Sequence, residues 1–421
     1  MVRWIKSLSL RSPEHVVLAT ALMAWAAGLS LILSHPIFVT NDSLSNYGHV
    51  WYVADVFWHG GGIPFHFPEI GHGDALAFPY GFLPWFSAAL VRPILGDWGT
   101  TLWLVLGGLG VLAGTFWAFP ELRKPLPATL LLVNPLMVES VILGQLPFLW
   151  ATALLFFGIG CWRRGWRWRA ILLVGLAQAG HPAVVLPLAG LLVVGCFAFE
   201  TDKRSYLLSY LATLIVAAPA TWLVLISPVV EDSSTSSLFA NFVGTVSLRA
   251  GVVAAPFVAL LLLRKWGAGW LWGAVALASL LNVVLVPIRD TSYGWGALVR
   301  GPNEQLAPFL ESPEFQPGAT YRLLRVADGK VGMYRLIQHG GRLDSEFFPE
   351  SISRRSWPSL EAYREFLHGR HVDYVVIYRA YDARYATNEH DLLNRMVSGG
   401  CAVQSTAFEQ FELYQIVGRC P

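Results

Sequence analysis

Residues 36–85 read PIFVTNDSLSNYGHVWYVADVFWHGGGIPFHFPEIGHGDALAFPYGFLPW, and this stretch decides how the rest of the sequence is interpreted. It follows a long apolar run at residues 16–33 and is itself amphipathic. Ionisable groups beside a membrane-embedded segment are costly unless they pair or serve a function. We therefore expect a polar loop at a membrane surface, in which ionisable side chains stand among aromatic ones: Asp42, His49, His59, His66, Glu69, His72 and Asp74.

The composition on either side of this loop divides the chain in two. Of the 421 residues, 54% are hydrophobic and only 14% are charged, whereas a soluble domain carries roughly 25% charged residues. The deficit falls in residues 1–290. We therefore predict a polytopic α-helical membrane domain at 1–290 with an outer loop at 37–78, a connector at 291–320 and an α/β domain at 321–421. The formal net charge of +2 gives no reason to expect a nucleic-acid partner.

Apolar segments and loop charges predict the topology. The run at 16–33 is longer than the core of a signal peptide, so we expect a retained first helix and about nine or ten apolar segments in all. Lys and Arg in the connections between segments predict a cytoplasmic N-terminus and an extracytoplasmic C-terminal domain in the inner membrane. Residues 79–95, with Arg92 and three prolines, are interpreted as a re-entrant or interfacial element, and a full span is the alternative. The further segments are 99–119, 126–143, 146–162, 169–180, 182–199, 205–228, 247–264 and 267–288.

Residues 321–421 have the patterns of a small α/β domain. VDYVVIY at 372–378 is typical of a buried strand, and residues 358–368 of a helix that Ser356 or Ser359 could cap. Strand-like runs are expected at 321–326, 332–337, 402–406 and 411–416, and a helix at 388–397. Cys401 and Cys420 lie on the two arms of the last hairpin and are able to pair in an oxidising compartment.

Two carboxylates are candidate catalytic groups. Asp42 lies just beyond the outer end of the first helix, where it could accept a proton from an incoming hydroxyl, and the alternative is that Asn41 or Asp42 caps the next helix. Glu139 lies within an apolar segment, one turn from its outward end, and the alternative is a structural hydrogen bond. We predict both as catalytic residues.

Polar residues at other predicted outward positions are candidates for substrate binding. Arg249 and Arg289 could neutralise a lipid phosphate, although arginines at helix ends also extend to the interface. The spacing of the loop histidines matches no recognised metal-ligand pattern, so a divalent metal has no support and the sequence requires no cofactor. The full set of predicted substrate-binding residues is His49, His72, Asp74, Gln145, His181, Arg249 and Arg289.

The order of these parts resembles the C-type membrane glycosyltransferases. The resemblance rests on an acidic residue at the outer end of the first helix, a long amphipathic loop, Gly71-His72-Gly73-Asp74 through Phe78-Pro79-Tyr80-Gly81, and Asn134-Pro135 leading to Gly144-Gln145-Leu146-Pro147-Phe148. It implies inverting transfer of a sugar from a polyprenyl-phosphate-linked donor to a lipid, glycan or protein acceptor, with Asp42 as general base. Many such enzymes have paired acids in the first loop, whereas Asn41-Asp42 supplies one here.

The chain is more similar still to bacterial membrane proteins labelled "6-pyruvoyl-tetrahydropterin synthase-related". The shared features are EFFPES at 346–351, the helix after it and the VDYVVIY strand, and none of them implies pterin chemistry. EFFPES is interpreted as a contact surface or, alternatively, as a turn packed on the domain. Two other functions remain open at this point: a lipid or solute transporter or flippase, with Glu139 as a coupling site, and a non-catalytic membrane scaffold with an external binding domain.

Overall fold

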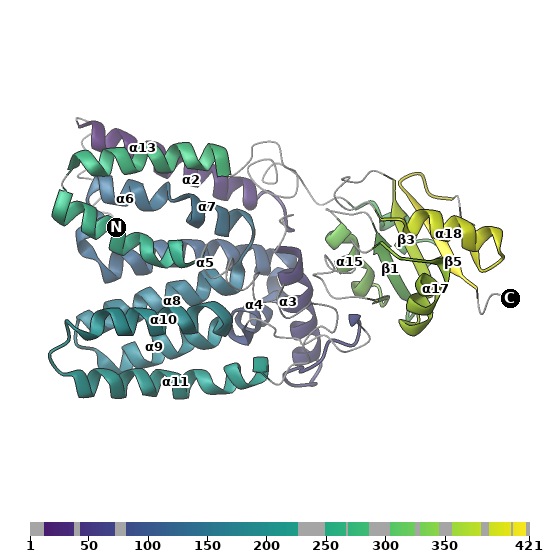
Figure 1. Ribbon diagram of the computed structural model, residues 1–421, viewed down its shortest axis with the longest axis horizontal. Coiled ribbons are helices and arrows are strands. Elements are labelled where there is room, and N and C mark those ends of the chain that lie inside the picture. The colour runs from purple at the N-terminus through teal and green to yellow at the C-terminus, as the bar shows by residue number, and fades with distance from the viewer. Residues whose placement is uncertain are drawn as a thin grey trace. The chain divides into compact units, whose positions relative to one another are not determined.

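The computed structural model describes residues 12–37, 43–71, 81–225, 249–266, 268–285, 304–324, 329–344, 356–379, 387–405 and 407–417. Its contacts divide the chain into two compact units. The helical unit comprises Met1–Asn46, Phe78–Ser227 and Thr235–Arg300, and the second unit comprises Tyr47–Ala77, Pro228–Ser234 and Gly301–Pro421 (Figure 1). The division falls within α3 (Ser43–Trp58), so this helix belongs to both units. The predicted outer loop is therefore grouped largely with the C-terminal residues.

Several helices of the helical unit begin at proline. Proline fits the first helical position because its missing N–H would have no partner there, and it occupies this position in α2, α6, α7 and α10. A further helix occupies residues 249–261 and continues as a π-helical turn, Leu262–Trp266. The helices are α2 (Pro13–Ile32), α4 (Phe82–Leu95), α5 (Asp97–Ala118), α6 (Pro125–Leu132), α7 (Pro135–Ile142), α8 (Leu146–Arg163), α9 (Arg167–Gly180), α10 (Pro182–Phe197), α11 (Lys203–Leu225) and α13 (Ala268–Leu285).

Several of these helices have the length and composition of membrane spans. In the described part of the chain, α2, α5, α8 and α11 are long and apolar enough to cross a bilayer, and the pair α6–α7 adds a fifth if it is one bent span. The other apolar helices are shorter. α4 has 14 residues and therefore rises only about 21 Å, less than the roughly 30 Å of a hydrocarbon core, so its length agrees with the predicted re-entrant or interfacial element.

The predicted segment at 126–143 is two helices that meet at an angle of 43°. The break is at Asn134-Pro135, where the Asn134 side chain accepts a hydrogen bond from the Leu136 amide at 3.2 Å and proline removes a donor. Two carbonyls near the break find side-chain donors instead. Trp25 Nε1 donates to Leu132 O and Asn282 Nδ2 donates to Val133 O, both at 2.7 Å. Such pairing is what makes a broken helix tolerable within a membrane.

The charged connections of the helical unit lie together at one end. Glu121, between α5 and α6, contacts Arg163 at 3.0 Å and Arg264 at 3.5 Å. Arg167, at the start of α9, lies 3.8 Å from Asp202, just before α11. Four basic connections are predicted to be cytoplasmic, and they are therefore linked to one another in space: Arg123-Lys124, residues 163–169, Lys203-Arg204 and Arg264-Lys265.

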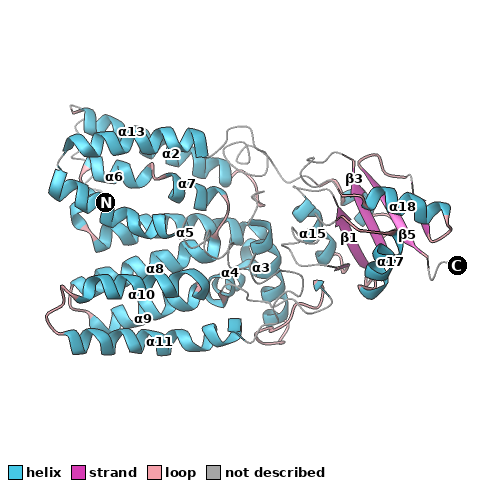
Figure 2. Cartoon of the chain, viewed as in Figure 1, coloured by secondary structure: helices cyan, strands magenta, loops and turns pink. Residues whose placement is uncertain are grey.

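The C-terminal domain is a five-stranded sheet with helices on both faces (Figure 2). Its strands are β1 (Thr320–Leu324), β2 (Arg342–Leu343), β3 (Tyr374–Tyr378), β4 (Ala402–Ser405) and β5 (Phe411–Ile416), in the order β2-β1-β3-β5-β4. β1 is parallel to β2 and β3, whereas β5 is antiparallel to β3 and β4. The helices are α14 (Ala307–Leu310), α15 (Gly329–Gln338), α17 (Leu360–Gly369) and α18 (Glu389–Ser398).

Alternate residues of β3 pack on opposite helix layers, as the two-residue period of a strand requires. Val375 and Ile377 belong to a core cluster with residues of α17 and α18. Tyr378 faces α15, where a Cβ added to Gly332 would lie 2.4 Å from the tyrosine hydroxyl. Ser359 caps α17 by accepting a hydrogen bond from the Ala362 amide, as one of the two predicted caps would. Cys401 is disulfide-bonded, and its predicted partner Cys420 lies outside the described residues.

The prediction of a strand at 332–337 is wrong, because these residues belong to α15. Val331, Tyr334 and Ile337 are buried and recur every three residues, which is the spacing of one helix face. β1 and β2 are also parallel neighbours, and parallel strands need a crossover between them that is usually a helix.

Candidate functional site

The outer loop enters the helical unit at the turn between α7 and α8. The Asn46 side chain donates through Nδ2 to Gly144 O at 2.6 Å and accepts at Oδ1 from Trp85 Nε1 at 2.7 Å. Asn46 and Trp85 are both buried, so these bonds form away from water. One asparagine thus joins the first turn of α3, α4 and the α7–α8 turn.

The other end of the outer loop meets the turn between α9 and α10. Gly81 has a φ of +151° and precedes α4 directly. A Cβ added to it would lie 1.9 Å from Gly180 O, so only glycine allows this approach of one backbone to the other. Gly180 is the last residue of α9 and precedes His181. The two ends of the loop are therefore each attached beside one of the predicted outward turns.

His181 and Arg249 form a polar contact at this end of the helical unit. Arg249 Nη1 lies 3.2 Å from His181 Nε2, and the guanidinium carbon lies 5.5 Å from the centre of the Phe148 ring. A guanidinium can only donate hydrogen bonds, so His181 Nε2 must accept and the imidazole must be neutral, with its proton on Nδ1. Phe148 also makes an edge contact with His181. The imidazole and the aromatic ring thus both contact the Arg249 guanidinium, and neither carries a formal charge.

Buried polar groups near these turns have unused hydrogen-bonding capacity. Gln178, one turn before His181, is 0% exposed, and neither its Oε1 nor its Nε2 has a partner among the described residues. The same holds for Gln145 Oε1, at the start of α8, and for Thr152 Oγ1 in the second turn of α8. A buried polar group without a partner is costly, and native proteins usually give it a water, an ion or a ligand. These groups therefore mark a place where a polar ligand could be bound.

Two predicted site residues lie elsewhere in the described structure. Glu139 is half-buried on α7, and its carboxylate forms no hydrogen bond or ion pair with the described residues. His49 is buried in the second unit, where its ring meets Phe67 edge-on at 5.8 Å and Phe67 stacks on Tyr52 at 4.0 Å. His49 is thus part of the aromatic core of the outer loop, and its predicted role in substrate binding stays a prediction.

The remaining predicted site residues, Asp42, His72, Asp74 and Arg289, lie outside the described residues, as does EFFPES at 346–351. In the ranges that are described, no group of three or more His, Cys, Asp or Glu side chains is arranged to hold a metal ion. Of the predicted set, the structure brings His181 and Arg249 into contact and places Gln145 one turn before Phe148, which touches both.

Sequence reasoning missed Asn46, Trp85, Phe148 and Gln178. Gln178 had a usable signal, since it is an uncharged polar residue in an apolar helix, three positions before the predicted turn at His181. Asn46 had only a weak one, because an asparagine four residues after a predicted cap suits many surface helices. Its partners are Gly144 and Trp85, and no local pattern predicts such distant pairs.

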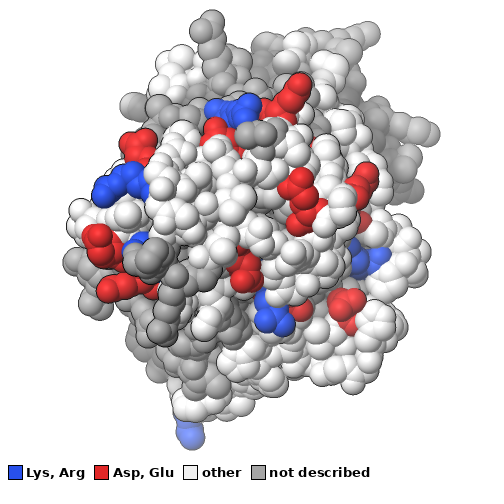
Figure 3. All heavy atoms as spheres, turned by 90° about the vertical axis from the view of Figure 1, so that its right-hand side faces the viewer, with Lys and Arg blue, Asp and Glu red and all other residues white. Residues whose placement is uncertain are grey.

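The two ends of the helical unit differ in charge. α8 carries Phe148 in its first turn and Arg163 at its end, about 22 Å apart along a helix of this rise. The Arg163 end holds the linked Arg and Glu side chains, whereas at the Phe148 end Arg249 contacts His181 and Phe148. An arginine at the end of an apolar helix is suited to binding an anion. Figure 3 shows a different face, on the side of the C-terminal domain, where charges of both signs are interspersed.

Comparisons with known proteins bear on the fold of the chain. No family model matches the chain, and no curated protein sequence matches it. A similar solved structure is that of ArnT from Cupriavidus metallidurans bound to undecaprenyl phosphate, with a TM-score of 0.53 and 12% identity over 96% of this chain and 98% of that chain. The chain shares this fold and combines apolar helices long enough to cross a membrane with a C-terminal α/β domain, which confirms the predicted fold class. The narrower resemblance to pterin-synthase-related proteins receives no support.

Proposed function

We propose that the chain transfers a sugar from a polyprenyl-phosphate-linked donor to a lipid, glycan or protein acceptor at the outer face of the membrane. The observation that carries the proposal is the contact between Arg249 and His181 in an apolar helical unit, with Gln178 one turn before His181 and without a hydrogen-bond partner among the described residues. The likeness in fold to ArnT, whose structure holds undecaprenyl phosphate, supports a lipid-linked donor.

Each residue has a defined part in the proposed reaction. Asp42 accepts the proton of the acceptor hydroxyl as its oxygen attacks the anomeric carbon, the bond from that carbon to the phosphate oxygen breaks, and the sugar configuration inverts. Arg249, with Arg289, stabilises the negative charge on the departing polyprenyl phosphate. Glu139 is the second acid, and His49, His72, Asp74, Gln145 and His181 orient the donor and the acceptor.

The proposed orientation places the Arg249 end of the helical unit outside the cell. The opposite end carries the cluster of Arg163, Arg264 and Glu121, and an excess of Lys and Arg favours the cytoplasm. The protein then lies in the inner membrane, with its N-terminus in the cytoplasm and its C-terminal domain on the extracytoplasmic side. The disulfide at Cys401 agrees with an oxidising compartment.

Transfer from radiolabelled polyprenyl-phosphate sugars, measured in membranes, tests this function. Wild type is expected to form a labelled product, and Asp42→Asn is expected to lower its rate by about a hundredfold or more, since a general base contributes about 10²–10⁴. The matched control is Asp55→Asn, which changes an exposed carboxylate on α3 and should leave the rate within about twofold.

The result has two ways to contradict the proposal. Transfer that survives in Asp42→Asn would remove Asp42 as the base while leaving the transferase assignment intact. A wild-type protein that transfers no sugar from any polyprenyl-phosphate donor, although it is present in the membrane at normal amounts, would overturn the assignment itself.

A further inference from the structure

The edge of the C-terminal sheet is occupied by the outer loop. Ile70 forms a parallel bridge with Leu343 on β2, and the Leu343 amide donates to Glu69 O at 2.7 Å. β2 uses its other amides toward β1, since Arg342 N donates to Ala319 O and Asp344 N to Tyr321 O. The Leu343 amide therefore serves the outer loop alone. The loop adds a short sixth strand segment beside β2 and covers an edge that would otherwise present unpaired groups.

Side chains of the same loop are buried within this unit. Tyr47, Phe67 and Ile70 have 1%, 0% and 1% of their surfaces exposed. The Tyr47 ring lies 6.1 Å from that of Tyr334 on α15. A loop that only connected two membrane segments would leave such side chains in water, so the burial of large apolar groups from both parts indicates a specific interface.

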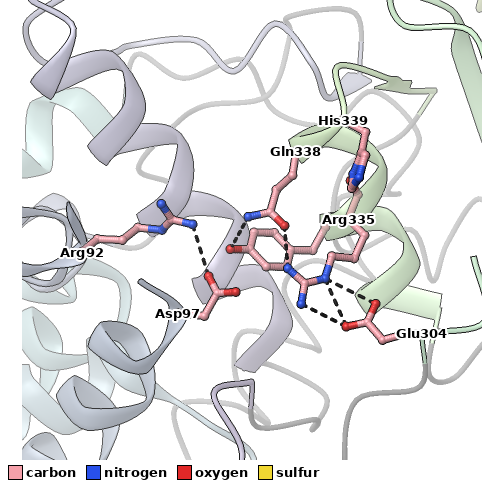
Figure 4. Close-up of polar contacts among 7 residues, drawn as sticks. Arg92, Asp97, Glu304, Arg335, Gln338 and His339 are labelled. Carbon is pink, nitrogen blue, oxygen red and sulfur yellow. Dashed lines mark hydrogen bonds and ion pairs between the residues drawn. The ribbon is translucent and has the colours of Figure 1, made fainter. Parts of the chain in front are cut away.

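The receiving surface on α15 is itself held by polar contacts. Gln338 Nε2 donates to the Tyr334 hydroxyl at 2.8 Å, and Arg335 Nη1 donates to Gln338 Oε1 at 2.9 Å (Figure 4). Arg335 also lies 3.0 Å from Glu304. These contacts fix the tyrosine against which Tyr47 packs. The interface is therefore formed by an ordered helix face and an ordered strand edge.

A carboxylate also lies at the junction of the loop and the sheet edge. Burial raises the pKa of the Glu69 carboxyl above its usual value, Asp55 acts in the same direction, and Arg342 on β2 opposes them. The positive charge of Arg342 thus acts on Glu69 across the same boundary as the hydrogen bond from the Leu343 amide. Backbone and apolar contacts join the loop to the domain, and this charge interaction acts in addition.

From these contacts we infer that the C-terminal domain is a positioning element of the outer loop, which holds residues 47–71 in the conformation needed for transfer. This inference rests on the proposed function, because the held residues begin five positions after the proposed base, Asp42. It makes Leu343 a positioning residue that touches neither donor nor acceptor. The domain is then part of the enzyme's working structure.

Leu343→Pro tests the inference because proline removes this one amide and keeps the bonds between β2 and β1. Its φ suits an edge strand, and it disfavours only helical geometry at Arg342, which is already extended in β2. The control is Leu343→Val, which retains the amide and a buried apolar side chain. Both substitutions are made in the full-length protein, alone and together with Ile70→Cys, whose thiol is buried while the loop is in place.

Two readings are taken on each variant: the kcat and KM of transfer, and the rate at which a membrane-impermeant maleimide labels the cysteine at position 70. A typical hydrogen bond changes an equilibrium about fivefold, so Leu343→Pro should label about five- to tenfold faster than Leu343→Val. It should also lower kcat by a similar factor while the KM for the donor stays within about twofold. A residue that only stabilised the domain would lower the amount of active protein and leave the labelling of that fraction unchanged.

Each other outcome counts against the inference. Unchanged labelling would show that the amide does not hold the loop. Faster labelling with unchanged kcat would show that the loop position does not matter for transfer. If the wild type transfers nothing from any donor, both the proposed function and this positioning role are overturned, while the labelling still decides whether the loop is held at the sheet edge.

Discussion

Two polar clusters among the described residues each contain an arginine, but the arginine of one is bonded to carboxylates, whereas the other lies near a glutamine with no described partner. In the C-terminal domain, Arg322 donates through Nε and Nη2 to the two oxygens of Glu389 at 2.8 Å, and through Nη1 to Asp344 at 2.7 Å. In the helical unit, Arg249 contacts a neutral imidazole and a ring, and Gln178 nearby has two amide atoms without described partners.

The difference separates a structural cluster from a candidate binding site. Every guanidinium nitrogen of Arg322 has a carboxylate partner, and the three side chains are at most 2% exposed, so the cluster has nothing left to offer a ligand. Burial acts to lower the pKa of Arg322, but Glu389 and Asp344 outweigh it and raise that pKa well above its usual value. Near His181, the buried amide of Gln178 retains a donor and an acceptor, and these can be satisfied only from outside the described residues.

The largest expected effect is a loss of stability when the cluster of Arg322, Glu389 and Asp344 is broken. Glu389→Ala removes two hydrogen bonds of a buried guanidinium and should lower the free energy of unfolding of the domain by about 3–5 kcal/mol. Thermal and urea unfolding of the purified full-length protein measure this change. The control is Glu365→Ala, an exposed acid on α17, which should change stability by less than about 0.5 kcal/mol. Equal stabilities of the two variants would contradict the structural role of the cluster.

The fold was predictable from the sequence only in part. The apolar segments of the sequence correspond closely to helices, because burial in lipid or protein requires long apolar runs and proline marks their first turns. VDYVVIY was recognisable as β3 from its β-branched and aromatic residues. The Arg322 cluster was not, since its partners Asp344 and Glu389 lie 22 and 67 positions away in sequence.

The candidate site was predictable only where a single residue is unusual for its position in the sequence. Gln145, His181 and Arg249 are polar residues at the ends of apolar segments, and the structure places them near one another through Phe148. The attachment of the outer loop to β2 was out of reach, because β2 has only two residues and its contact with Ile70 is a single bridge. Short strands and long-range pairs leave no periodic signal.

The second prediction concerns Arg249, which contacts His181 in the helical unit. Arg249→Ala should lower kcat/KM for the proposed donor by about a hundredfold, since the loss of one partner from a desolvated charge pair costs about 2–5 kcal/mol. Arg249→Lys keeps the charge without the planar fork and should recover only part of the loss. Transfer assays on membranes with matched amounts of protein measure both.

The control for Arg249 lies at the other end of the helical unit. Arg264 is 69% exposed and contacts Glu121, so Arg264→Ala should leave kcat/KM within about twofold. If Arg264→Ala and Arg249→Ala are equally impaired, the loss reflects positive charge on the chain in general. The distinction between the two ends of the unit would then fail.

The smallest expected effects are on stability. Replacing a buried amide by leucine should stabilise the protein at one position and destabilise it at another, so the two substitutions together test the comparison directly. Gln178→Leu removes a buried amide that has no described partner and should raise stability by about 1–2 kcal/mol, while the KM for the donor rises by about tenfold. Asn46→Leu removes a buried amide that is bonded to Gly144 and Trp85 and should lower stability by about 1–3 kcal/mol. Thermal unfolding in detergent measures both. If a structural water already satisfies Gln178, its substitution will also destabilise the protein, and its amide will then be a structural group like those bonded to Arg322.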